Sequence, residues 1–486
     1  MLRICRVSRK TAEQAREAGP HRGPRASWRS AWLGLRLPLL ATLVAMFAGG
    51  ALIAASDSDV IGEVGRAVGR LTPGRIAKSL VAILMAIGGS WCYLSQRFRG
   101  AMRYGRNIEW IVRLGGLVIG PLLAAFLLAQ AGFDGVFVGA VRSALAAYRS
   151  MFEGALGNPA AILAALQSGS FGGVVEAFNP LSESLVTAAP YVFSGLSVAV
   201  GLRCGLFNIG AEGQLFVGAI CSVVTGYAVK GLPPILHVPL ALGMGAFGGA
   251  LWAAIPGILK GRYGSNEVIN TIMLNYVAFR LTEWLLSGPI RRPGESMPFS
   301  QVIEPSAELT RMLPYPSRLH LGVFLALGAA ALLCWFLFRT TYGLEIRLVG
   351  QNPNAAKCGG INLPRTYLIA FCISGALAGL AGANEILGMS HCLSNAISPG
   401  YGFESISLSI LGGNHPIGVV LASLLFGALR SGATHMQNIA RIPLEIITVV
   451  QALVIALIAA PRIVQTVFHI GGKAGERLVL TRGWGR

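Results

Sequence analysis

Charged residues are scarce in this chain. They make up 13% of its 486 residues, while apolar residues make up 53%. Soluble globular proteins carry roughly 25% charged residues. The composition therefore excludes an ordinary soluble protein and favours one that crosses a membrane many times.

The chain also lacks the short motifs of nucleotide and metal chemistry. It contains no G-x-x-x-x-G-K-[ST] loop, so we expect no segment to hold the phosphates of ATP. It has no H-E-x-x-H spacing, its seven histidines are well separated, and no two of its eight cysteines have CxxC spacing. Neither a metal site nor a disulfide framework is indicated. We expect no catalytic residues and no cofactor in this chain.

Apolar runs close to 20 residues long recur along the sequence, which is the length needed to cross a hydrocarbon core of roughly 30 Å. They predict an all-α polytopic membrane protein with about 10–12 transmembrane helices, one or two of them broken or re-entrant. The expected spans are 37–55, 76–96, 111–131, 186–202, 207–229, 238–259, 267–287, 319–338, 366–388, a composite region 404–432, and 444–460.

The formal charge of +19 comes from short basic clusters beside these spans. A strongly basic protein can bind nucleic acid, but clusters at span ends are what the positive-inside rule predicts for cytoplasmic segments. We therefore expect both termini and the loops 97–110 and 339–365 in the cytoplasm. The loops 132–185 and 288–318 are expected on the outer side.

Two polar, glycine-containing stretches interrupt apolar runs. One is GLFNIGAEGQ at 205–214, and the other is LGGNHP at 411–416. Lipid tolerates irregular, polar backbone only where protein or a water-filled cavity surrounds it. Proline and glycine break helices, so the region 401–432 is expected to form two half-spans that meet at Asn414–Pro416. Small residues four apart, at Gly245/Gly249 and Gly375/Gly379, predict close helix packing.

Four segments together carry a family resemblance: GLFNIGAEGQ (205–214), EVINTIMLNY (267–276), TYGLEIRLVGQNPNAAKCGG (341–360) and GYGFESISLSILGGNHP (400–416). In this order they resemble the inner-membrane permease subunits of ABC importers of the nucleoside and simple-sugar type. The first two segments are most similar to permeases for purine nucleosides. The resemblance covers residues 105–465.

The resemblance implies a non-enzymatic transport subunit, multi-pass in the bacterial inner membrane. Its partners would be cytoplasmic ABC ATPase subunits that bind ATP and Mg²⁺, a second permease subunit, identical or homologous, an extracytoplasmic substrate-binding lipoprotein, and membrane lipid, with no nucleic acid. The expected regions are a basic tail (1–36), an extra helical hairpin with an arginine-rich loop (37–105), the permease domain (106–465) and a second basic tail (466–486).

Two alternatives stay open at this stage. One is a simple-sugar ABC permease. The other, from a different class, is an ion-coupled secondary transporter, because such proteins also use broken helices near the membrane midplane. The sequence shows no clear internal repeat and no chain of intramembrane acids suited to a proton relay, which disfavours the second alternative.

Candidate site residues fall into two groups. The polar residues expected to face the substrate pathway are Asn208, Glu212, Gln214, Asn275 and Glu404. Nucleoside hydroxyls and ring nitrogens can hydrogen-bond to such carboxylate and amide groups. The structural alternative is that Asn208 caps the following helix and Glu212 pairs with Arg203. By resemblance, the residues expected in a coupling helix that contacts the ATPase are Gly343, Arg347, Gly350, Asn352, Ala355, Ala356, Lys357 and Gly359.

Overall fold

The computed structural model of the chain describes residues 134–440, most of 49–69 and the single positions 72, 74, 79, 81, 448, 449 and 452. All regular elements in this part are helices, accompanied by two isolated β-bridges. Five of these helices are long and apolar enough to cross a membrane. The predicted all-α polytopic membrane fold is confirmed. The predicted spans 76–96, 111–131 and 444–460, most of 37–55, and both tails lie outside the described residues.

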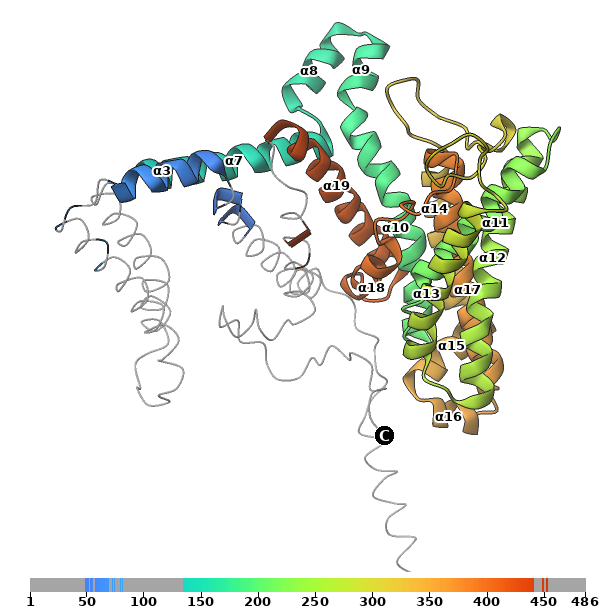
Figure 1. Cartoon of the computed structure of the whole chain (residues 1–486). Coiled ribbons are helices and arrows are strands. Elements are labelled where there is room, and N and C mark those ends of the chain that lie inside the picture. Colours follow the sequence, from blue (N-terminus) through green and yellow to red (C-terminus); the bar gives the residue numbers. More distant parts are fainter. Residues whose placement is uncertain are drawn as a thin grey trace, which may run out of the picture.

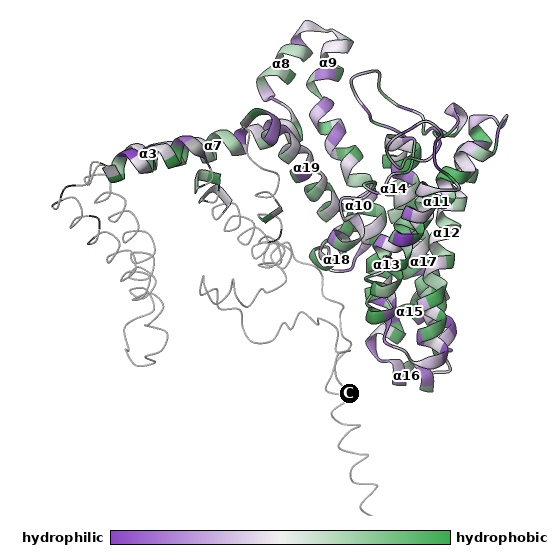
Figure 2. Cartoon of the chain, in the orientation of Figure 1, coloured by the Kyte–Doolittle hydropathy of each residue, from purple (hydrophilic) through white to green (hydrophobic). Residues whose placement is uncertain are grey.

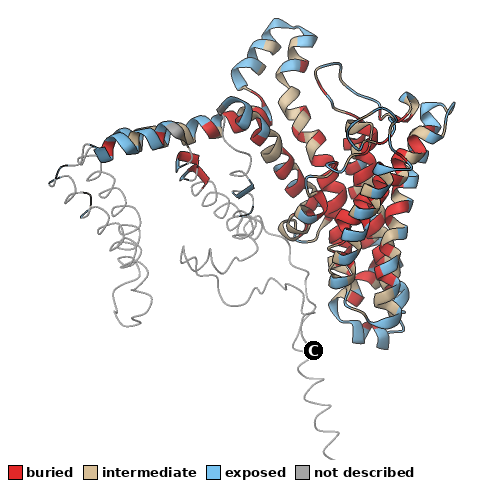
Figure 3. Cartoon of the chain, viewed as in Figure 1, coloured by how far each residue is buried: buried red, intermediate tan, exposed pale blue. Residues whose placement is uncertain are grey.

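A helical bundle forms the core of the molecule (Figure 1). Its long members are α10 (Asn179–Arg203), α11 (Ala211–Ala228), α12 (Pro234–Tyr263), α13 (Glu267–Ser287), α14 (Gly322–Arg339), α17 (Leu363–Glu385) and α19 (Pro416–Ala440). Helix α17 packs against α10, α11 and α12, and buried residues concentrate in these helices (Figure 3). Many residues of these helices are apolar, green in Figure 2, and apolar side chains such as Leu251, Trp335 and Leu421 are exposed, as lipid requires.

Glycines allow α12 and α17 to approach backbone to backbone. A Cβ on Gly249 would lie 2.8 Å from Gly379 Cα, and one on Gly375 would collide with the Gly249 carbonyl. On α12, Gly245 likewise faces the backbone of Gly379. The two predicted small-residue pairs therefore meet each other, in the close helix packing that such pairs favour in membranes.

The predicted long loop 132–185 is largely helical over its described part, residues 134–185. It forms α7 (Asp134–Leu156), α8 (Pro159–Ser168) and α9 (Phe171–Ala177), and α7 packs against α3 (Ser58–Gly69) and α19. Small side chains and scattered polar ones give α7 a weak hydropathy signal, which explains the wrong prediction. Its buried residues Ala147 and Met151 contact Ala433 and Met436 of α19 in a separate small core.

Helices also break where the sequence predicted. Helix α18 (Tyr401–Leu411) ends at Gly412, and α19 begins at Pro416 after Asn414, which has a positive φ of 56°. Eleven residues span about 17 Å, so α18 reaches only part of the way through a bilayer, whereas the 25 residues of α19 suffice to cross it. The predicted break is confirmed, but the prediction of two half-spans is wrong for α19, which is long enough to cross the membrane.

The two ends of the bundle differ in structure. At one end, α15 (Thr341–Gln351) and α16 (Pro353–Cys358) follow α14, and they lie at the bottom of Figure 1. At the other end, the segment 288–321 folds over the bundle with a single short 3₁₀ turn, η3 (Pro305–Ala307). It covers the π-helical turn η4 (Ile386–Ser390), which extends α17.

Candidate functional site

A cluster of amides holds the break between α10 and α11. Asn208 Nδ2 donates to Gln214 Oε1 at 2.9 Å and to Ser374 Oγ of α17 at 2.8 Å. Asn208 Oδ1 accepts from the Gly210 N–H at 2.9 Å. Asn208 and Gln214 are each 1% exposed. Both amides are satisfied within the protein, as buried polar groups must be, so in this conformation they stabilise the break.

Asn275 of α13 supports the same break. Its Oδ1 accepts from the Gly213 N–H at 2.9 Å, and its Nδ2 donates to the Ile209 carbonyl at 3.0 Å. The first N–H groups of a helix lack partners within that helix, and Gly213 lies in the first turn of α11. Asn275 therefore anchors the start of α11 to α13.

Glu212 joins the start of α11 to the start of α18. Its carboxylate accepts from the Gly402 N–H at 2.6 Å and also interacts with the Phe403 N–H and the Ser398 hydroxyl. A carboxylate at a helix N-terminus is favoured by the helix dipole and by charge-assisted hydrogen bonds. The alternative that Glu212 pairs with Arg203 is wrong, because Arg203 Nε donates to the Asn414 carbonyl at 2.8 Å.

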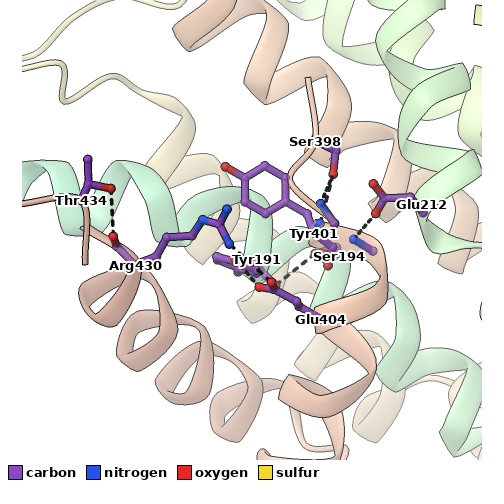
Figure 4. A network of polar contacts seen from close by, with 10 residues as sticks. Tyr191, Ser194, Glu212, Ser398, Tyr401, Glu404, Arg430 and Thr434 are labelled. Atoms are coloured by element: carbon purple, nitrogen blue, oxygen red, sulfur yellow. Dashed lines mark hydrogen bonds and ion pairs between the residues drawn. The ribbon is translucent and has the colours of Figure 1, made fainter. Parts of the chain in front are cut away.

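Glu404 belongs to a second polar cluster, formed by α10, α18 and α19 (Figure 4). Tyr191 donates its hydroxyl to Glu404 Oε2, and Arg430 Nη1 lies 3.4 Å from Glu404 Oε1. The side chains of Arg430 and Glu404 are 32% and 24% exposed. Charged side chains inside a membrane usually face a pathway or a partner. This ion pair is only partly covered by the rest of the described structure.

The residues predicted to couple to the ATPase lie on or beside α15 and α16. Gly343, Arg347 and Gly350 are on α15, and Ala355, Ala356 and Lys357 are on α16. Asn352 caps α16, since its Oδ1 accepts from the N–H groups of Asn354 and Ala355, and Gly359 ends that helix. Apart from Ala356, the residues of α16 are exposed. This exposed helical turn is available to a partner.

Helix α15 connects this turn to the break after α10. A side chain on Gly350 would collide with the Arg203 carbonyl, and a Cβ on Gly205 would lie 3.3 Å from Gly350 Cα. Glycine at both positions therefore permits direct backbone contact between α15 and the end of α10.

Phe338, near the end of α14, joins both breaks to α15. The Arg203 guanidinium carbon lies 5.6 Å from the centroid of the Phe338 ring, and that of Arg347 lies 5.1 Å away. The His415 ring stacks on the same ring at 5.2 Å between centroids. We call Phe338, Arg203, Arg347 and His415 the Phe338 hub.

The structure thus brings Asn208, Glu212, Gln214 and Asn275 together and places Glu404 in the neighbouring cluster. Sequence reasoning missed Tyr191, Arg430 and Phe338. Arg430 carried a usable signal, since an arginine within an apolar run is rare in a membrane helix. Tyr191 and Phe338 carried none, because aromatic residues are common in such helices.

Known proteins resemble most of the chain. The family described as branched-chain amino acid transport system / permease component matches residues 180–459. The guanosine ABC transporter permease NupP of Bacillus subtilis is 40% identical over 61% of this chain and 84% of its own length. The nucleoside ABC transporter permease NupB of Lactococcus lactis is 32% identical over 73% of this chain and 92% of its own.

A third relative has a different substrate in its name. The glucose ABC transporter permease TsgB13 of Haloferax volcanii is 34% identical over 57% of this chain and 74% of its own length. No solved structure matches the chain. The family match over residues 180–459 and these relatives support the resemblance inferred from the four sequence segments.

Proposed function

Because the chain belongs to the family of branched-chain amino acid transport system permease components, we propose that it is the transmembrane subunit of an ATP-driven importer of nucleosides, in particular purine nucleosides. The proposed substrate rests on two relatives, named for guanosine and for nucleoside transport. This chain matches them over 84% and 92% of their lengths. The ion-coupled alternative receives no support from this family.

The proposed assembly contains two permease subunits, two cytoplasmic ATPase subunits that bind ATP and Mg²⁺, and an extracytoplasmic binding lipoprotein, in a bacterial inner membrane. The ATPase contact is α16, since it is exposed and follows Arg339 and Arg347, whose positive charge favours the cytoplasmic side. The segment 288–321 at the opposite end of the bundle then faces the binding protein.

ATP binding would draw the ATPase subunits together and move α16. That motion reaches the end of α10 through the contact between Gly350 and Arg203, and it reaches the α18–α19 break through the bond from Arg203 to the Asn414 carbonyl. Helix α18 carries Glu404. Glu404, with Tyr191 and Arg430, is our candidate for substrate contact in the pathway, and the Asn208, Gln214, Asn275 and Glu212 contacts hold the pathway helices in register.

The test is purification of the complex with the subunits encoded beside it, followed by ATPase assays with the binding protein and different substrates. We expect stimulation by purine nucleosides and not by ribose or leucine. Reversing the charge of Lys357 on α16 should abolish uptake while leaving membrane insertion intact. Retained uptake would refute the coupling role, and recovery of the chain without an ATPase would refute the assembly.

The second candidate is a sugar permease, favoured by the similarity to the glucose permease TsgB13. Stimulation by glucose in the same assay, with no response to nucleosides, would establish it.

A further inference from the structure

Five buried polar atoms beneath residues 288–319, which we call the lid, have no hydrogen-bond partner among the described residues. They are His320 Nε2, Asn384 Nδ2 and Oδ1, and His391 Nδ1 and Nε2. His320 is 0% exposed and Asn384 is 1% exposed. An unsatisfied buried polar group costs about 1–3 kcal/mol, and native proteins contain few of them. Five of these atoms, on three side chains, belong to this one part of the protein.

Two glycines bring these side chains together. A Cβ on Gly322, at the start of α14, would collide with Asn384 Oδ1 and lie 2.7 Å from the His320 ring. A Cβ on Gly388, in η4, would lie 2.6 Å from His320 Nε2. His391 interacts electrostatically with His320. The three side chains therefore share one small region between α14, α17 and η4.

The backbone at this place is irregular. Residues Ile386–Ser390 form a π-helical turn, and His391, which ends it, has a positive φ of 54°. Single π-turns occur frequently at functional sites, and a positive φ is uncommon in residues other than glycine. These features add an independent indication of a site.

The chemistry of the cluster selects an uncharged ligand. The Gly322 N–H donates to His320 Nδ1 at 3.1 Å, so the proton of the neutral ring is on Nε2, which is then a donor. Asn384 offers a donor and an acceptor, and neutral His391 offers one of each. Burial lowers the pKa of His320 to about 4, and His391 and Arg311 add to that shift.

Charged ligands and metals fit this cluster poorly. The carboxylate next to Asn384 in sequence, Glu385, interacts electrostatically with Arg318. In the described part of the chain, no three histidine, cysteine or acidic side chains are placed to hold a metal ion. The site thus offers donors and acceptors without net charge, which suits a molecule rich in hydroxyl and amide groups.

We propose that His320, Asn384 and His391 form a binding site for the uncharged polar substrate on the lid side of the membrane, closed by the lid in this conformation. This rests on the proposed function, since nucleosides carry the required hydroxyls and ring nitrogens. Backbone bonds hold the lid to the same turn: Ile303 donates to the His391 carbonyl at 3.0 Å and Leu309 to the Leu387 carbonyl at 2.8 Å. Displacing the lid exposes the site.

Direct binding to the permease–ATPase complex in nanodiscs, without binding protein, tests the site. The variant Asn384→Leu removes both amide atoms at similar volume. Asn179→Leu is the matched control, because Asn179 Oδ1 is also buried without a partner but belongs to α10. We expect Asn384→Leu to weaken binding of labelled guanosine at least tenfold and the control to leave it unchanged.

His391→Asn is the second variant, since asparagine tolerates a positive φ and the fold does not depend on burying this partly exposed ring. We expect it to weaken guanosine binding as well. If Asn384→Leu does not fold, the binding measured for His391→Asn tests the proposal. Unchanged binding in the folded variants, with a higher melting temperature for Asn384→Leu, would mean that the cluster holds ordered water only and would overturn the proposal.

The same experiment separates this proposal from the proposed function. If the wild-type complex binds labelled glucose and not guanosine, the nucleoside assignment fails. Binding of labelled glucose to the two variants then tests the site. If the wild-type complex binds neither compound, the site itself is refuted.

Discussion

Replacing Phe338 with leucine should uncouple ATP hydrolysis from transport. The ring contacts the Arg203 and Arg347 guanidinium groups and stacks on His415. Leucine keeps the apolar character of the position but removes the aromatic face that attracts cations. The substitution therefore acts on the link between α15 and the two helix breaks, with little effect on the packing of the bundle.

The size of the effect follows from the contacts in the Phe338 hub. A partly exposed cation–π contact contributes about 0.5–1 kcal/mol, and an aromatic stack contributes about 0.5–1.5 kcal/mol. Phe338 makes two contacts of the first kind and one of the second. Together they give about 2 kcal/mol, which corresponds to roughly a 30-fold change in the balance between two conformations.

The assay compares nucleoside uptake with ATPase activity in proteoliposomes that contain the whole complex. For Phe338→Leu we expect basal ATPase activity to remain and uptake per ATP hydrolysed to fall at least tenfold. Phe324→Leu is the matched control, because Phe324 lies on the same helix with a half-exposed side chain and no aromatic contact in the described structure. Equal uptake per ATP in both variants would refute the reasoning.

Two further predictions concern stability. Gly375→Leu should lower the melting temperature sharply, because the new side chain meets the Gly249 backbone and overpacking costs about 1–3 kcal/mol or more; Gly328→Leu, on an open surface of α14, should leave it unchanged, and an equal loss in both would contradict the packing. The pKa of His320 is lowered to about 4 in the folded protein. As pH falls below about 6.5, this histidine is therefore protonated in the unfolded state before it is protonated in the folded state. Stability should be complete above that pH and fall by up to about 3 kcal/mol toward pH 4. His320→Gln should flatten this slope in a thermal unfolding series, and an unchanged slope would exclude His320 as its cause.

Features that depend on local chemistry could be predicted from the sequence. The breaks at 204–210 and 412–415 were predictable because glycine, proline and polar side chains cannot continue a helix in lipid. The exposed α16 was predictable from its asparagine cap and its basic flank. The pairs Gly245/Gly249 and Gly375/Gly379 were predictable as contact surfaces, but nothing in the sequence indicates that they contact each other.

Features that depend on tertiary arrangement could not be predicted. Phe338 is one of many aromatic residues in apolar runs, and its importance arises only because α10, α15 and the second break meet at its ring. The lid cluster has the same origin, since His320 and Asn384 are 64 positions apart in sequence. Helix α7 escaped prediction because its small and polar residues resemble those of a loop.

The polar residues at the two breaks argue for concerted motion. Each break contains backbone groups that lipid cannot satisfy, and each obtains its partners from another helix: Asn275 bonds to the start of α11, Glu212 to the start of α18, and Arg203 to Asn414. Moving one break alone would leave buried polar groups without hydrogen-bond partners, which costs about 1–3 kcal/mol for each group. Moving α10, α11, α13 and α18 together keeps these bonds. A force applied at α15 is therefore expected to displace these helices as one unit, and Glu404 travels with it.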